Sequence, residues 1–160
     1  MKRTISLVLT LALALSAMLG IVSGAASESG ELAISGANLE FGDTVYLYFA
    51  VDYSAVGLSD DITLKVTNTV TGEVKTLERD ESVESTKGFP RSSVGFKLDN
   101  LGAKNMGDKL TLQAYYNGTA SGASVEYSIL EYTLKARELY PSYTDLTDVC
   151  DTLIAFGATA

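Results

Sequence analysis

In the stretch TVYLYFAVDY, residues 44–53, Tyr46 and Tyr48 lie at positions where their rings could bind a ligand. Successive side chains of a strand point to opposite faces. One face therefore has Val45, Leu47, Phe49, Val51 and Tyr53, and the other has Tyr46, Tyr48, Ala50 and Asp52. Flat aromatic rings on an open sheet face can stack on sugar rings. Tyr115, in a second expected strand, is a third candidate for the same face. These three tyrosines form our candidate ligand face.

The tyrosine face has three competing interpretations. It could stack on a glycan chain, contact a partner protein or sister module, or serve as ordinary strand surface and as the floor under a C-terminal helix. Tyrosine is enriched in strands even where no ligand binds, and the chain contains no Trp, the residue most often used for sugar stacking. These two facts favour the strand-surface or helix-floor interpretation.

Several acids at expected strand ends are candidate calcium ligands, because calcium prefers hard oxygen ligands from carboxylates and carbonyls. They do not have the spacing of an EF-hand loop, and turn capping is the competing interpretation. The candidates are Asp52, Asp60, Asp61, Asp99, Asn100 and Asp108. We expect no cofactor. Calcium is the one ion whose binding these residues suggest as a test.

Catalysis is not expected. The chain has no histidine, which removes serine triads, cysteine–histidine pairs and histidine-based zinc sites in their usual forms. Paired carboxylates could support glycoside hydrolysis. With 20 acids in the chain, however, such pairs arise without any catalytic purpose, and most acids lie in polar runs such as ERDESVE. We therefore expect the protein not to be an enzyme.

The N-terminus has the three-part pattern of a secretory signal peptide. A short basic head is followed by the uncharged run ISLVLTLALALSAMLGIV and then by the small residues SGAAS. We expect cleavage near residue 26, and a retained membrane anchor is the competing interpretation. Removal of residues 1–26 takes away Lys2 and Arg3 but no acid, so the net charge changes from −8 to −10.

The acidic mature chain is expected outside the cell or at the cell surface. Its charge disfavours binding to nucleic acid or to an anionic membrane. The single cysteine, Cys150, lies at helical spacing with Leu146, Leu153 and Ile154 in the sequence DLTDVCDTLIAF. We interpret it as a small buried apolar residue rather than a reactive thiol.

Residues 27–140 are expected to form one β-sandwich. Short alternating segments recur at regular spacing, including GDTVYLYFAVDY, ITLKVTNTV, VKTLER, SVGFKLDNL, KLTLQAYY and ASVEYSI. About six to eight such strands, separated by turn signals such as Asn117-Gly118, predict a mainly β, antiparallel, immunoglobulin-like sandwich. Residues 80–92 are charged and contain Pro90, so we expect a long exposed connection there.

The C-terminal part changes to a helical period. Residues 128–140 are expected to run from a strand end into a helix that Pro141 stops. Residues 141–160 then predict a C-terminal helix that packs on the sandwich. Ser142 or Thr144 is the expected N-cap, and Gly157 is the expected end.

Several motifs in order resemble an accessory domain family of large secreted proteins from clostridial-type Gram-positive bacteria. Members have a G-a-x-L-x-F-G-D opening, an A-K-x-M-x-D-x-I-T segment, a Y-S-V-x-D-Y element and a closing helix. The matching residues here are 36–43, 103–111, 127–132 and 146–160. The resemblance implies an accessory β-sandwich attached to other surface modules, with no established site residues. Relatives continue past the position of Ala160, so the resemblance also implies a shortened chain.

We therefore expect a non-catalytic extracellular accessory or interaction module. The alternative is a carbohydrate-binding module that uses the tyrosine-bearing sheet face. Expected partners are another protein or a sister module, with cell-wall or dietary polysaccharide as the partner under the alternative.

Overall fold

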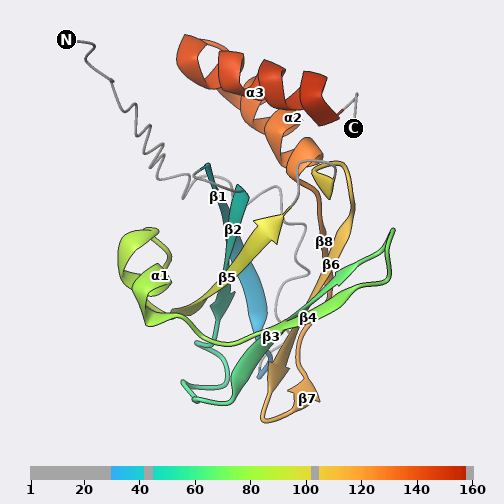
Figure 1. Ribbon diagram of the computed structural model, residues 1–160. Helices are drawn as coiled ribbons and strands as arrows, with labels where there is room; N and C mark the ends of the chain where they lie inside the picture. The colour runs from blue at the N-terminus through green and yellow to red at the C-terminus, as the bar shows by residue number, and fades with distance from the viewer. Residues whose placement is uncertain (1–29, 42–44, 102–104, 158–160) are drawn as a thin grey trace, which may run out of the picture.

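The computed structural model describes residues 30–41, 45–101 and 105–157. The expected signal peptide at residues 1–26 therefore lies outside the described residues. Within the described ranges the chain forms eight strands and three helices, and the strands make two antiparallel sheets that face each other (Figure 1). The predicted mainly β, antiparallel sandwich with a C-terminal helix is confirmed.

The first sheet, called sheet A, has the strand order β1-β2-β5. Its strands are β1 (Ala33–Phe41), β2 (Val45–Asp52) and β5 (Ser93–Leu101). The register of β1 against β2 shifts between Ile34 and Gly36, which is where the sequence pattern is broken by Ser35-Gly36. Residues 45–52 of the stretch TVYLYFAVDY thus form β2, the central strand of sheet A.

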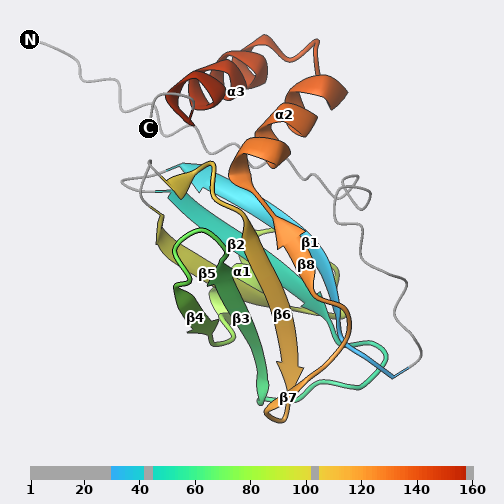
Figure 2. The ribbon, with the colours of Figure 1, turned by 90° about the vertical axis from the view of Figure 1, so that its right-hand side faces the viewer.

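The second sheet, called sheet B, has the order β4-β3-β6-β7, and β8 also pairs with β6 (Figure 2). Its strands are β3 (Ile62–Asn68), β4 (Val74–Leu77), β6 (Leu110–Tyr116), β7 (Thr119–Ala120) and β8 (Val125–Tyr127). Strands 1, 2 and 5 thus face strands 3, 4, 6 and 8, an immunoglobulin-like arrangement of two sheets.

The tight turn predicted at Asn117-Gly118 is confirmed. Both residues have positive φ, 49° and 76°, as a two-residue hairpin turn requires when its twist matches that of the flanking strands. The turn joins β6 to β7, where Tyr116 pairs with Thr119.

The core lies between the sheets and follows the predicted alternation. In β3 and β6 the buried residues alternate with half-buried ones, and the buried set includes Leu64 and Leu112. Phe49 of β2 and Phe96 of β5 meet them from sheet A, with no exposed surface. Complete burial of each such side chain stabilises the fold by about 1.5–3 kcal/mol.

Residues 80–92 are the expected connection, and residues 81, 82, 88, 90 and 91 are exposed, but the segment also contains helix α1 (Glu81–Thr86), which we did not expect. The chain crosses from sheet B to sheet A just before it. Arg79 pairs with Phe96 as an isolated bridge, and the backbone N–H of Asp80 donates to the carbonyl of Gly95. Helix α1 then lies beside β5 (Figure 1).

Helices α2 (Ile129–Leu139) and α3 (Thr144–Gly157) form a hairpin at one end of the sandwich (Figures 1 and 2). Ser128 caps α2 directly after β8, in agreement with a strand end that runs into a helix. Helix α3 packs chiefly against α2 rather than on a sheet. No helix among the described residues is long and apolar enough to cross a membrane.

Candidate functional site

Tyr48 lies on the outer face of sheet A, where the alternation of β2 predicts it, but it is not an open ring. It is only 6% exposed. The ammonium group of Lys87 lies over the ring, 4.2 Å from its centre. Lys87 is also ion-paired with Glu40 of β1. Tyr48 is therefore covered by a lysine that follows α1, and not by the closing helix that the floor interpretation expects.

The pKa values around Tyr48 reflect this cover. Burial, and secondly a hydrogen bond to the Glu40 carboxylate, raise the pKa of Tyr48 to about 12. The hydrogen bond from Lys87 lowers the pKa of Glu40 and outweighs the opposing effect of its burial. At neutral pH Tyr48 is thus a neutral phenol and Glu40 is a carboxylate.

Tyr46 lies two residues before Tyr48 on the same face and is half-buried. The ammonium group of Lys97 lies 4.5 Å from the centre of its ring. Lys97 comes from β5, the strand that pairs with β2 on the side opposite β1. The two tyrosines of β2 are therefore each covered by a different lysine.

Tyr115 does not share the face of Tyr46 and Tyr48, so the expectation that the three form one face is wrong. The two strands involved, β2 and β6, belong to different sheets. Each of the three tyrosines points away from the shared core, so Tyr115 lies on the opposite outer side of the sandwich. Lys65 of β3 lies over its ring at 4.8 Å. The ammonium group of a lysine thus lies over each of the three candidate rings.

Residues 80–92, here called the strap, cover the outer face of sheet A next to Tyr48. Below the strap, Gly36, Ala50 and Gly95 pair in register across the three strands and form a row of small residues. A Cβ atom on Gly95 would lie 2.8 Å from Cγ1 of Val83, which is itself 2% exposed. The row thus forms a shallow trough that α1 fills.

The second apolar contact of the strap is Phe89. A Cβ atom on Gly36 would lie 3.6 Å from the Phe89 ring, which is an ordinary packing distance. Phe89 therefore lies over the β1 end of the trough, while Val83 fills the β5 end. Together the two side chains make a small second apolar layer outside the main core.

Charged groups fix the strap at its first turn. The Asp80 side chain accepts a hydrogen bond from the N–H of Ser82 and caps α1. Arg79 binds Glu84 with two hydrogen bonds, from Nε at 2.6 Å and from Nη2 at 3.0 Å. Hydrogen bonds from Ser82 lower the pKa of Asp80, and those from Arg79 lower the pKa of Glu84.

The calcium candidates are not brought together. The Asp52 side chain accepts from the N–H of Ser54, and Asp60 makes an ion pair with Arg79 at 3.7 Å. Asp108 accepts from the side chains of Asn68 and Asn105 at 2.6 Å and 2.7 Å. Asp61, Asp99 and Asn100 are exposed. In the described part of the chain, no group of three or more acids or cysteines could hold a metal ion.

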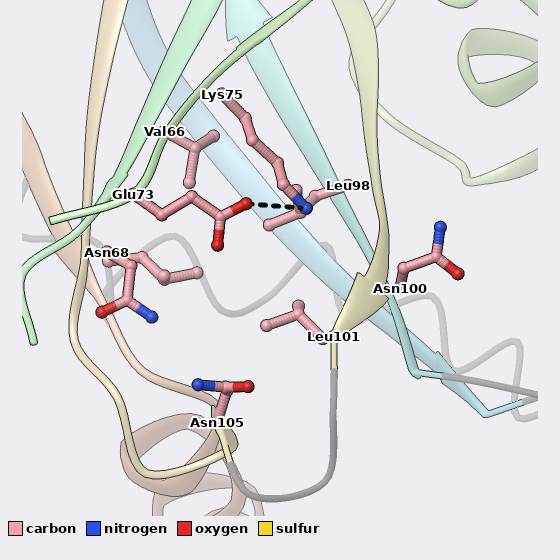
Figure 3. Close-up of a pocket in the computed structure, with 9 residues that line it drawn as sticks. Val66, Asn68, Glu73, Lys75, Leu98, Asn100, Leu101 and Asn105 are labelled. Carbon is pink, nitrogen blue, oxygen red and sulfur yellow. Dashed lines mark ion pairs between the residues drawn. The ribbon is translucent and has the colours of Figure 1, made fainter. Parts of the chain in front are cut away.

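A small cavity of about 60 Å³ lies between the sheets near the end of β5. Figure 3 shows Val66 and Leu98 beside Asn68 and Asn105, and the Glu73–Lys75 ion pair, 3.6 Å long, in the same space. Cavities of this size hold a few water molecules. The lining combines apolar walls, amide groups and this one ion pair.

Three of the exposed large apolar side chains in the described part of the chain lie on the helical hairpin. Leu134 and Leu139 of α2 are each 46% exposed, and Tyr143 in the loop before α3 is 58% exposed. The hairpin has its own small cluster, in which Ala136 and Cys150 are buried and Tyr140 packs against them. The prediction that Cys150 is buried is confirmed.

Sequence analysis missed the strap and the exposed side of α2. The strap could have been predicted from the small residues Gly36, Ala50 and Gly95. Each lies on the outward-facing side of a different strand and leaves the sheet there without a large side chain to cover it. The start of α2 also had a signal, because Ser128 and Glu131 have the S-x-x-E spacing of a capping box. The N–H of Glu131 does donate to the Ser128 hydroxyl.

Comparisons of the chain with models of protein families, with curated proteins and with solved structures find no match.

Proposed function

We propose that the protein is a non-catalytic interaction module, exported and held in or near the cell surface of a Gram-positive bacterium, and that it contacts a partner protein through its helical hairpin. The observation that carries this proposal is the exposure of Leu134, Leu139 and Tyr143 on one appended element. Large apolar side chains exposed on one element are typical of protein interaction sites.

The hairpin also has the polar surroundings that such a site requires. Arg137 of α2 and Asp151 of α3 form an ion pair at 2.8 Å, and Lys135 pairs with Glu138 at the same distance. Both pairs are largely exposed, so they contribute little to stability. Exposed apolar side chains accompanied by charged ones are the usual composition of an interface between proteins.

Export and attachment to a larger surface protein are further parts of the proposal. They are supported by the leader pattern of residues 1–26, by the acidity of the remaining chain and by the resemblance to accessory domains of clostridial-type surface proteins. A sister module of the same surface assembly is the partner that this resemblance favours.

The non-catalytic part is supported by the sequence and by the arrangement of the acids. The chain contains no histidine. Several of the described acids are used in caps and ion pairs, for example Asp80 on α1 and Glu84 with Arg79. Carbohydrate binding on the tyrosines is the weaker candidate, because a sugar would have to displace a lysine from each ring.

The test compares binding by the mature chain and two matched variants. Leu134→Ser/Leu139→Ser alters the hairpin, and Val70→Ser/Val74→Ser replaces two exposed valines, 70% and 53% exposed, around β4. Each protein is immobilised and offered surface proteins of the producing organism, and separately insoluble cell wall and mucin polysaccharides. Circular dichroism checks that all three remain folded.

We expect the wild type and the β4 variant to retain the same protein. Retention by the hairpin variant should fall by about tenfold or more, as for loss of apolar interface anchors. Equal retention by all three proteins would exclude the hairpin as the contact. Retention on polysaccharide, lost on Lys65→Ala/Tyr115→Ala substitution in a folded variant, would instead support the carbohydrate-binding alternative.

A further inference from the structure

The strap is attached to the sandwich through a small apolar contact. Val83 fills the space over Gly95, and Phe89 lies over Gly36. Helix α1 has only six residues, which is too short to be stable without these contacts. The apolar part of the attachment is therefore limited to two side chains on a row of small residues.

Backbone hydrogen bonds hold the two ends of the strap: the N–H of Asp80 donates to the carbonyl of Gly95, and the N–H of Tyr53 donates to the carbonyl of Ser92. Three side-chain contacts between these ends contain a carboxylate. Asp80 caps α1, Glu84 accepts two hydrogen bonds from Arg79, and Glu40 is paired with Lys87. Protonation of a carboxylate removes its negative charge and one acceptor site, so each attachment weakens in acid.

Other charged groups face these carboxylates. Arg79 is also within 3.9 Å of Glu81 and 3.7 Å of Asp60, both exposed. Lys97 on β5 acts on both Glu40 and Asp80 and favours their charged forms. Asp80 opposes the charge of Glu84. Because the chain contains no histidine, carboxylates are the groups that change charge below neutral pH.

The main core between the sheets has no such dependence. Among the described residues, those buried between the sheets are apolar apart from the phenol of Tyr127, which is already protonated in acid. The contacts between sheets are apolar, as shown by Phe49 and Leu112. Acid should therefore weaken the strap more than it weakens the sandwich.

We propose that the strap is a pH-sensitive cover that leaves the outer face of sheet A as one unit in acid, while the two sheets remain paired. Its release exposes Tyr48 and the trough formed by Gly36, Ala50 and Gly95. The protein thus has two surfaces, one presented at neutral pH and one uncovered in acid.

The directions of the pKa shifts agree with release of the strap in acid. The pKa values of Glu40, Asp80 and Glu84 are all lowered in the folded protein, from 4.5, 3.8 and 4.5 respectively. A lowered pKa contributes stability that is complete above the unfolded value and is lost as the pH falls through the folded value. Release is therefore expected below about pH 4.

Hydrogen exchange followed by mass spectrometry tests the proposal on the mature chain, from about pH 7 to about pH 2, after correction for intrinsic exchange rates. We expect the protection of amides in residues 81–89 to fall by about tenfold before that of β3 and β6 changes. Simultaneous loss in the strap and both strands, or a strap that stays protected while the pH falls, would overturn the proposal.

Substitutions separate the loss of charge on the strap carboxylates from unfolding of the whole protein in acid. Glu40→Gln/Glu84→Gln should lower strap protection at neutral pH by about tenfold, with β3 and β6 unchanged. Glu126→Gln is the matched control, because Glu126 is exposed and its only described ion pair is with Lys109 at 3.8 Å. Gly95→Ala should open the strap at every pH, because its Cβ would clash with Val83. Strap protection in the double variant equal to that of the control would refute the role of the carboxylates.

Discussion

The ammonium group of Lys87 lies 4.2 Å from the centre of the Tyr48 ring and is ion-paired with Glu40. The contact joins residues that are 39 positions apart in sequence and places the strap across β1 and β2. Tyr48 is therefore a structural residue of the outer face of sheet A. Its ring supports a lysine where a ligand platform would need an open surface.

Replacement of Lys87 by Met should lower the free energy of unfolding by about 1 kcal/mol, because it removes the cation–π contact and the ion pair but keeps an apolar stem. Urea denaturation measures the change. Lys97→Met is the matched control, and it should cost less because Tyr46 is less buried than Tyr48 and Lys97 has no described ion pair. Equal losses in the two variants would contradict the special role of Lys87.

Gly122→Ala should be strongly destabilising, by about 2–4 kcal/mol or more. Gly122 has φ +72°, and a Cβ there would lie 1.9 Å from the carbonyl oxygen of Leu32, so the start of β1 must move. Gly118→Ala is the comparison. Its φ is +76° but nothing lies within 4 Å of the added atom, so only the backbone strain of about 1 kcal/mol applies. Similar thermal stability of the two variants would show that the Leu32 contact is not formed.

Tyr127→Phe should leave stability unchanged or raise it by up to about 1 kcal/mol. The Tyr127 hydroxyl is buried and has no hydrogen-bond partner among the described residues, while its ring packs edge-on against Phe49. Tyr48→Phe removes a hydroxyl that is bonded to Glu40, so it should cost about 1 kcal/mol. The ranking is checked by urea denaturation, and a larger loss for Tyr127→Phe than for Tyr48→Phe would reverse it.

Alkaline pH should destabilise the protein through its buried tyrosines. Burial raises the pKa of Tyr48 and of Tyr132 to about 12 and raises that of Tyr127 as well. A raised pKa contributes stability that is complete below the unfolded value of about 10 and is lost as the pH rises through the folded value. The free energy of unfolding should thus fall between about pH 10 and pH 12.

The alkaline effect is measured by urea denaturation together with ultraviolet absorbance of tyrosinate. Tyr132→Phe should make the decline shallower, because it removes one of the raised pKa values. A free energy of unfolding that stays constant to about pH 12 would contradict the burial of these phenols.

The strands could be predicted from the sequence because buried apolar residues alternate strictly with outward-facing residues along a half-buried strand, as in β3 and β6. The turn at Asn117-Gly118 was equally clear, since few residue pairs favour two successive positive φ angles. The position of Tyr115 was not predictable in the same way. Alternation assigns a residue to the inside or outside of a sheet, but it does not say which of two sheets contains the strand.

The strap escaped prediction for a different reason. Its segment is mostly polar, and only Val83 and Phe89 are apolar and packed, so local periodicity gives no helix signal. The information lies in the partner surface, in Gly36, Ala50 and Gly95, which become neighbours only when β1, β2 and β5 pair. The packing of α3 on α2 likewise depends on the exit angle of α2 from the sandwich, which the sequence pattern does not contain.

Site-resolved nitration of tyrosines on the native mature chain at neutral pH is the most direct test of the central claim, that the helical hairpin and not the face of Tyr48 is available to a partner. The account predicts rapid modification of Tyr143, which is 58% exposed, and protection of Tyr48, which is 6% exposed. Modification of Tyr48 as fast as that of Tyr143, in a protein that remains folded, would contradict it and restore the tyrosine face as the binding surface.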